Sequence, residues 1–203
     1  MGITVAPTKS NLIKGRASLE LSKTGYELLD KKRNVLIREM MELVEKAKEI
    51  QDHIYGTIEE AYGALQTVNI TMGIKDVEDI AHSIPVDEDF KILLKSVMGV
   101  DIPIIKYKES TSAPSYTFHN TNPALDQAVA KFTQVRYMIY TLTEVENSVY
   151  KLAKEIQKTL KRANALEYIQ IPRYKQQVKY IQEVLEEKER EDFFRLKMIN
   201  NRE

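Results

Sequence analysis

Apolar residues recur every three or four positions along the first third of the chain, from Leu19 to Val68. The series is Leu19, Ser22, Tyr26, Leu29, Arg33, Leu36, Met40, Leu43, Ala47, Ile50, Ile54, Thr57, Ala61, Ala64 and Val68, and twelve of its fifteen positions are apolar. A 3.5-residue period sustained for about seven heptads is typical of a coiled-coil helix and not of an ordinary domain helix of roughly eleven residues. The pattern predicts one long helix over residues 10–68.

A second series with the same period follows Asn122-Pro123, where Asn can cap a helix and Pro suits the first helical position. Ten of its eleven positions are apolar: Ala128, Phe132, Val135, Ile139, Leu142, Glu146, Val149, Ala153, Ile156, Leu160 and Ala163. Two helices of matching length should pair side by side in opposite directions. We therefore predict a mainly α protein, a long antiparallel two-helix coiled coil formed by the N- and C-terminal helices.

Pro172 lies inside the second helical pattern, which resumes at Tyr174, Val178, Ile181 and Leu185. Proline removes one backbone donor and clashes with the preceding turn, at a cost of about 3 kcal/mol unless a bend absorbs it. We predict a kink or a phase shift at Pro172. The alternative is that Pro172 simply ends the helix.

The middle segment, residues 70–121, is punctuated by Gly and Pro and contains a turn-rich stretch at 110–115. The β-branched and aromatic runs at 100–107 and 115–119 bracket that stretch and predict a small β-hairpin, with residues 90–97 as a further extended piece. The expected organisation is an N-terminal coiled-coil helix (1–69), a middle segment with a short helix and a hairpin (70–121) and a C-terminal coiled-coil helix (122–203), as one elongated unit.

Four residues do not fit a plain coiled-coil seam. Arg33 occupies a seam position, where a polar residue fixes register at a cost in stability. Gly25, Gly56 and Gly63 lie inside the first helix, where each costs roughly 1 kcal/mol relative to Ala. Either close helix approach or tolerated drift would explain the glycines.

Composition excludes several classes of protein. The chain has no Cys, so it has neither disulfides nor thiolate metal ligands nor a cysteine nucleophile, and nothing suggests an oxidising compartment. No apolar run approaches the roughly 18–20 residues of a membrane helix, and the N-terminus lacks a signal-peptide pattern. The 30 basic and 30 acidic side chains balance, which argues against a general nucleic-acid binder. We expect a protein on the cytosolic side that does not insert directly into the membrane.

Charge is nevertheless banded along the chain. Residues 1–33 hold seven basic and three acidic side chains, and residues 34–100 hold six basic and thirteen acidic ones. Residues 151–181 are again basic, and residues 182–194 are acidic. Banding suggests distinct neighbours at distinct heights along the helices, and a solvated helix surface is an equally good explanation.

Candidate chemistry is sparse. Lys23-Thr24-Gly25 has the letters of a phosphate loop in the wrong order and in mid-helix. His53, His82 and His119 are isolated from one another, without a second ligand at metal-binding spacing. The carboxylate clusters fit solvated helix surfaces, because acid–base chemistry needs a concave site. We therefore predict no catalytic, cofactor-binding or metal-binding residues.

Several motifs together resemble the D subunits of the V-type and A-type rotary ATPases. The C-terminal part carries Arg162-Ala-Asn-Ala-Leu-Glu-Tyr-Ile-Gln-Ile-Pro-Arg-Tyr and Glu189-Arg-Glu-Asp-Phe-Phe-Arg-Leu-Lys. The N-terminal part carries Pro7-Thr8-Lys9 and Gly25-Tyr-Glu-Leu-Leu-Asp-Lys-Lys-Arg, and Met98-Gly-Val-Asp-Ile-Pro lies in the middle. The resemblance thus covers both ends and the middle of the chain.

The resemblance implies a non-catalytic central-stalk rotor subunit, peripheral on the cytoplasmic face of the membrane. Its expected partners are a ring of catalytic and non-catalytic nucleotide-binding subunits, a small central-stalk subunit and a membrane-ring adaptor subunit. Basic positions that match the family pattern would contact the ring: Lys9, Lys14, Arg16, Arg195 and Lys197. Residues in the hairpin region would contact the small stalk subunit: Ile102, Ile104, Tyr107, Tyr116 and Phe118. An equally good alternative is that these side chains pack on the chain's own helices.

Three other classes remain as alternatives. A freestanding coiled-coil scaffold would explain the heptads but neither the hairpin nor the motifs. An enzyme that hydrolyses ATP as an isolated chain would need a phosphate loop. The γ-type axle of F-type ATP synthases shares the antiparallel helices, but we would expect a larger α/β domain between them than about fifty residues allow.

Overall fold

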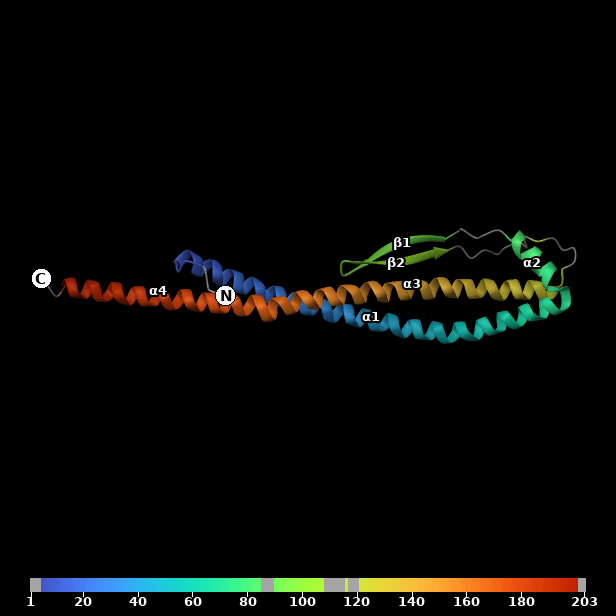
Figure 1. Cartoon of the computed structure of the whole chain (residues 1–203), viewed down its shortest axis with the longest axis horizontal. Coiled ribbons are helices and arrows are strands. Elements are labelled where there is room, and N and C mark those ends of the chain that lie inside the picture. Colours follow the sequence, from blue (N-terminus) through green and yellow to red (C-terminus); the bar gives the residue numbers. More distant parts are fainter. Residues whose placement is uncertain (1–4, 85–89, 108–115, 117–120, 201–203) are drawn as a thin grey trace. The chain divides into compact units, whose positions relative to one another are not determined.

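The computed structural model describes residues 5–84, 90–107, 116 and 121–200 (Figure 1). Its elements in chain order are α1 (Lys9–Met72), α2 (Ile74–Ser83), β1 (Phe90–Val97), β2 (Val100–Tyr107), α3 (Pro123–Ala165), the π-helical turn η1 (Leu166–Gln170) and α4 (Ile171–Asn200). The fold is mainly helical, with long N- and C-terminal helices in contact and an antiparallel hairpin in the middle of the sequence, as predicted. The chain divides into two compact units, residues 36–155 and residues 1–35 with 156–203.

In the unit of residues 36–155, α1 and α3 run antiparallel. Nζ of Lys131 lies 2.5 Å from Oε2 of Glu60. One or two residues further along each helix, the rings of Tyr62 and Phe132 meet edge to face with centroids 5.7 Å apart. Earlier on α1 and later on α3, Nε2 of Gln51 donates to Oε1 of Glu146 at 3.3 Å. From the first of these contacts to the last, the position moves back along α1 from Glu60 to Gln51 and forward along α3 from Lys131 to Glu146, which establishes the antiparallel direction.

The second unit shows the same direction of pairing between the start of α1 and α4. Nζ of Lys9 lies 3.0 Å from Oε1 of Glu189, and Nη2 of Arg16 donates to Oε1 of Gln182 at 3.2 Å. Ile181 is fully buried in this unit. Because all four charged and polar side chains are exposed, these contacts set alignment more than stability.

The predicted seam of the first helix is confirmed along its whole length. All fifteen positions are buried or half-buried, and Leu36, Ala61 and Val68 are completely so. Arg33 is half-buried at its seam position, and its Nη2 lies 2.5 Å from Oδ1 of Asp30. This ion pair within one helical turn lets the seam carry a charged residue without a partner from the facing helix.

The predicted seam of the second helix is displaced over part of α3. Ile139 and Leu160, which we expected to be buried, are 45% and 39% exposed. The buried positions instead come one residue before predicted ones: Val145, Ser148, Leu152 and Thr159. An α-helix drifts about 20° per heptad from a strict 3.5-residue period, so a fixed stepping loses the face after a few heptads. Ser148 can be buried because its hydroxyl donates to the carbonyl of Glu144 at 2.7 Å.

The glycines of α1 differ in what surrounds them. A Cβ on Gly56 or Gly63 would meet no atom within 4 Å, and a Cβ on Gly25 would lie at an ordinary 3.7 Å from Cδ1 of Leu166. Close helix approach is therefore the wrong explanation for these three. The close approach occurs at buried Gly15, where a Cβ would lie 3.1 Å from Cγ2 of Val178.

Alanine at Gly56 and at Gly63 is expected to raise the free energy of unfolding by about 1 kcal/mol each, because alanine restricts the unfolded chain and meets no clash in the helix. Gly15→Ala serves as the matched variant and should gain less or lose stability, since Val178 must shift. Urea unfolding followed by circular dichroism measures all three. An equal gain at Gly15 would contradict a tight contact there.

The hairpin that the structure describes is built from β1 and β2, so the predicted extended piece at 90–97 is a strand paired with 100–107. β1 and β2 pair antiparallel from Phe90↔Tyr107 to Val97↔Val100. The turn between them is only Met98 and Gly99, both with positive φ (51° and 79°), as in the two-residue turns that match strand twist. Apart from Tyr116, residues 115–119 lie outside the described residues.

The predicted phase shift at Pro172 is confirmed as a π-helical turn. η1 precedes the proline, and the N–H of Ile171 donates to the carbonyl of Leu166, five residues back. The helix continues through Pro172 to Asn200, so proline does not end it. The carboxylate of Glu167 in η1 lies beside Tyr26 and, as the main cause, raises the pKa of that phenol. The wider π turn accommodates Pro172, which has no N–H to donate. Its extra residue also shifts the phase of the apolar pattern in α4.

Candidate partner-binding site

The hairpin is held against α3 by aromatic rings. Tyr107 at the end of β2 stacks on Tyr137, with centroids 4.8 Å apart and planes at 14°. Tyr140, one helical turn later, lies 5.6 Å from Tyr107 and 5.7 Å from Phe90 of β1. Such pairs contribute about 0.5–1.5 kcal/mol each beyond the area they bury. The open end of the hairpin is therefore anchored to the helix.

A backbone contact fixes β2 further along. The N–H of Ile105 donates to Oε2 of Glu144 at 2.7 Å. Since Ile105 pairs with Ile92 across the ladder, this N–H points away from β1 and would otherwise be an open edge group. Pro103 lies two residues earlier on the same edge and has no N–H to offer. The outer edge of β2 is thus closed by a carboxylate and by a proline.

β1 is much more exposed than β2. Seven of its eight residues are exposed, whereas β2 has only two exposed residues and a buried Val100. Ile92 and Leu94 are 61% and 66% exposed although they are apolar. Within this unit β2 is therefore the strand that packs on α3, and β1 is the strand that faces outward.

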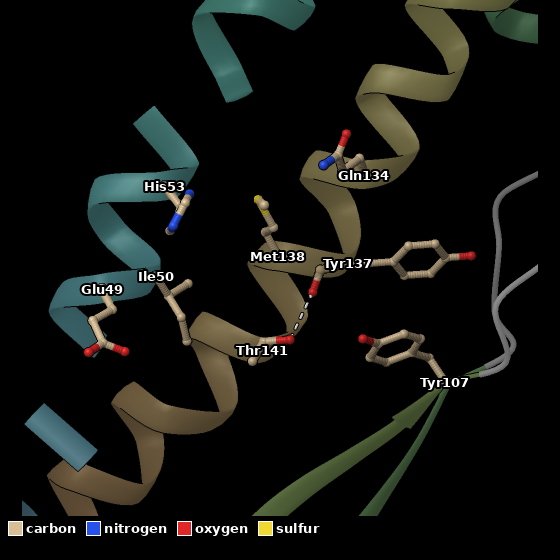
Figure 2. A pocket seen from close by; sticks show the side chains of 8 residues that line it. All are labelled: Glu49, Ile50, His53, Tyr107, Gln134, Tyr137, Met138 and Thr141. Atoms are coloured by element: carbon tan, nitrogen blue, oxygen red, sulfur yellow. Dashed lines mark hydrogen bonds between the residues drawn. The ribbon is translucent and has the colours of Figure 1, made fainter. Parts of the chain in front are cut away.

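A hollow of about 460 Å³ lies beside the Tyr107–Tyr137 stack (Figure 2). α1 lines it with Glu49, Ile50 and His53, and α3 lines it with Gln134, Met138 and Thr141. The Thr141 hydroxyl donates to the carbonyl of Tyr137 at 3.1 Å, a bond within the helix. The side chains that surround the hollow are mixed in character, with Glu49 and His53 one helical turn apart on α1.

Tyr116 is buried against the last part of α1 and the start of α3. Its side chain belongs to a cluster with Val68, Leu125 and Ala128, and its hydroxyl donates to the carboxylate of Asp126 in the first turn of α3. Burial, with the neighbouring carboxylate, raises the pKa of Tyr116 to about 12. The neutral phenol is therefore the form that this cluster stabilises, and the stabilisation is lost as pH rises from about 10 through 12.

The basic residues expected to contact the ring all have exposed side chains in one unit. Lys9 and Arg16 contact α4 through Glu189 and Gln182. Arg195 lies beyond these contacts and pairs with Glu191 and Asp192 on its own helix, at 3.8 and 3.9 Å. Lys14 and Lys197 are exposed as well. The antiparallel pairing therefore brings the start of α1 beside the C-terminal part of α4, as the expectation requires.

The residues expected to contact a small stalk subunit are in different surroundings. Ile102 and Ile104 are half-buried on one face of the hairpin, and Tyr107 and Tyr116 contact the chain's own α3. Phe118 lies outside the described residues. Sequence reasoning missed β1 as the exposed strand, Glu144 as the cap on β2, and Gly15. The signal for the hairpin was available, because Met98-Gly99 separates two extended runs by two residues.

Other kinds of site are not formed by the residues that the structure describes. No three His, Asp or Glu side chains among them come together as a metal site would require. Likewise, none of the helices in the described ranges is long and apolar enough for a membrane span. The described residues form long paired helices with exposed charges and a hairpin with one strongly exposed strand.

Comparison with known proteins defines the family. The family model described as the D subunit of ATP synthase matches residues 11–201. The chain is 44% identical over 200 residues to the V-type ATP synthase D subunit of Thermotoga neapolitana, covering 98% of each chain. It is 37% identical to the A-type ATP synthase D subunit of Pyrococcus furiosus, covering 97% of this chain and 94% of the relative, and 38% identical to that of Methanopyrus kandleri, covering 97% and 86%. The chain belongs to the family of ATP synthase D subunits.

Proposed function

We propose that the chain is the non-catalytic rotor subunit in the central stalk of a V/A-type ATPase. It would couple ATP hydrolysis or synthesis in a ring of nucleotide-binding subunits to rotation and to H⁺ or Na⁺ translocation. The observation that carries the proposal is the antiparallel pairing of α1 with α3 and with α4, in a chain of this family. A continuous buried seam resists bending and twisting, which is what an axle needs.

The coupling follows from symmetry. A single chain inside a three-fold ring makes different contacts with each neighbour, so the nucleotide affinities of the three neighbours differ. By linkage, nucleotide turnover in the ring favours a new orientation of the chain. Turning the chain in the same way changes the nucleotide affinities of its neighbours. The chain needs no catalytic group of its own for this role.

The proposed partners are the ring of catalytic and non-catalytic subunits, a small central-stalk subunit and an adaptor to the membrane ring, on the cytoplasmic face of the membrane. Exposed basic side chains at the paired ends of α1 and α4 would steer and align the chain in the ring. Family membership favours this rotor over a freestanding scaffold, because a scaffold gives no reason for the match over residues 11–201.

The first test is gentle purification of a tagged chain from its source cells, with identification of the recovered chains and an ATPase assay on the same sample. Recovery of a near-stoichiometric ring of nucleotide-binding chains with ATPase activity is the expected result. Recovery of the chain alone, or with unrelated coiled-coil proteins and no ATPase activity, would favour the scaffold.

Neutralising the five basic end residues together is expected to weaken assembly and coupled turnover. The variant replaces each of them by Gln: Lys9, Lys14, Arg16, Arg195 and Lys197. Loss of steering charges lowers association rates, by about 10- to 1,000-fold when a whole steering field is removed and by less at high salt. Ring recovery and ATPase activity across a salt series measure the effect.

The matched control removes the same number of exposed positive charges elsewhere: Arg38, Lys46, Lys48, Lys75 and Lys154. It changes net charge equally, so only the position of the charges differs. Equal assembly of both variants, at the level of the unchanged chain, would refute a contact role for the end residues.

A further inference from the structure

The outer edge of β1 has the geometry of a docking site for a strand. A two-residue turn makes Val97↔Val100 a hydrogen-bonded pair, and such pairs alternate along an antiparallel ladder. The N–H and C=O groups of Ile92, Leu94 and Ser96 therefore point away from β2. The bond from Ile105 to Glu144 fits this alternation, because Ile105 lies opposite Ile92.

The two outer edges of the hairpin differ in whether their backbone N–H groups are protected from pairing. The outer edge of β2 is closed by Glu144 and Pro103. The outer edge of β1 has neither device, and no other strand pairs with it among the described residues. Its apolar side chains are among the most exposed in this unit, with Leu94 at 66%. An edge with exposed apolar side chains is a template for pairing, and edge lysines such as Lys91 and Lys95 disfavour neighbouring strands that lack acidic residues.

Lysines on the hairpin face opposite to Ile92 and Leu94 indicate what kind of strand would pair with β1. Lys91 lies directly opposite Lys106, and like charges at such positions repel. Lys95 follows on the same face of β1, and all three lysines are exposed. None of them has a carboxylate within ion-pairing distance in the described part of the chain. A neighbouring strand with acidic residues beside Lys91 and Lys95 would relieve this repulsion.

We propose that β1 binds, through its outer edge, an extended strand of a partner subunit that places acidic side chains beside Lys91 and Lys95. Backbone groups of Ile92, Leu94 and Ser96 provide the hydrogen bonds, and the lysines select the partner strand. This inference rests on the proposed function for the presence of partner subunits. It also moves the partner contact from the side chains of β2 to the backbone of β1.

Leu94→Pro tests the backbone edge. Residue 94 lies opposite Pro103 at a pair that exchanges no ladder hydrogen bonds, so proline leaves the hairpin's own bonds in place. It removes one outward N–H, and the loss of that bond with the added clash should lower partner recovery about tenfold or more in complexes purified through a tag on this chain. Leu94→Ala removes the same side chain, keeps the N–H, and should retain much more of the partner.

Lys91→Glu tests the charge and does not depend on proline. It turns the repulsive pair with Lys106 into an attractive one, so it should stabilise the hairpin of the isolated chain while weakening partner recovery about tenfold. Lys106→Glu creates the same attractive pair with the same net charge, but it places the carboxylate on β2. It should lower partner recovery far less. Hydrogen exchange in the purified complex should slow at Ile92, Leu94 and Ser96 relative to the isolated chain.

The outcomes separate this proposal from the proposed function. If the unchanged chain recovers nucleotide-binding subunits and both Leu94→Pro and Lys91→Glu recover every chain at the same level, the edge proposal is overturned and the rotor stands. If these two variants lose a partner of a complex without nucleotide-binding chains, the edge proposal is supported and the rotor is overturned. Recovery of the unchanged chain alone would overturn both.

Discussion

Leu152→Ala is expected to lower the free energy of unfolding by about 3 kcal/mol, within the 2–5 kcal/mol that buried Leu-to-Ala changes cost. Leu152 is 1% exposed and belongs to the largest buried side chains of the described residues. A core between two paired helices is only one layer of side chains thick, so few neighbours can move in to fill the cavity. Urea unfolding followed by circular dichroism, with a shift of the midpoint at constant slope, is the measurement.

Leu21→Ala is the matched control, because Leu21 is 74% exposed on α1. Its truncation should change stability by less than about 0.5 kcal/mol, as for most surface substitutions. Equal losses in the two variants would mean that the seam does not carry the stability of the coiled coil. An assembly defect of Leu21→Ala without a stability defect would instead mark its side chain as a partner contact.

Deletion of Ile169 is expected to destabilise the unit of residues 1–35 and 156–203 by about 3 kcal/mol, because it sets Pro172 in a regular α-helix. Ile169 lies in η1 and is 62% exposed, so little packing is lost with it. A π turn contains one residue more than an α turn. Deleting that one residue leaves a regular α turn, so the helix beyond it keeps its rotation relative to α1. Val178 and Ile181 should therefore stay on the face that meets α1, and the loss should come from the proline alone.

Pro172→Ala in the same deleted chain should restore most of the lost stability, which makes the pair a double-mutant test. Deletion of exposed Lys175 is the control. It rotates all residues beyond it by about 100° and takes Ile181 off the face, so Pro172→Ala should not rescue it. Failure of Pro172→Ala to rescue the Ile169 deletion would show that η1 does not serve to accommodate Pro172.

Much of the fold could be predicted because the signals are local and repeated. The seam from Leu19 to Val68 follows from periodicity alone, and Pro172 marks a defect that any helix must absorb. The face of α3 near Ile139 and Leu160 could not be predicted by fixed steps, since drift accumulates and since Ser148 and Thr159 are buried although they are polar. Burial of hydroxyl groups depends on hydrogen bonds to the preceding turn, which a pattern of apolar residues does not reveal.

The candidate site depended on contacts between distant segments, and the sequence carries little sign of those. In the sequence Glu144 looks like any other helix carboxylate. In the structure it accepts a hydrogen bond from the N–H of Ile105, 39 residues away. β1 is exposed because β2 is the strand that packs on α3. The sequence does not show which strand does so, since both strands are rich in apolar residues. Only the two-residue turn at Met98 and Gly99 could have identified the right strand pair beforehand.

The antiparallel pairing of the helices also sets an order of folding. The paired residues Lys131 and Glu60 are 71 positions apart in sequence, Gln51 and Glu146 are 95 apart, and Arg16 and Gln182 are 166 apart. Contacts between near positions form faster, and each doubling of separation adds about 0.6 kcal/mol of loop-closure entropy. Pairing thus starts beside the cluster of Val68 and Leu125 and spreads toward the chain ends. The ends close last and fray first, so the segment that carries the basic residues is the one most readily available to be ordered by a partner.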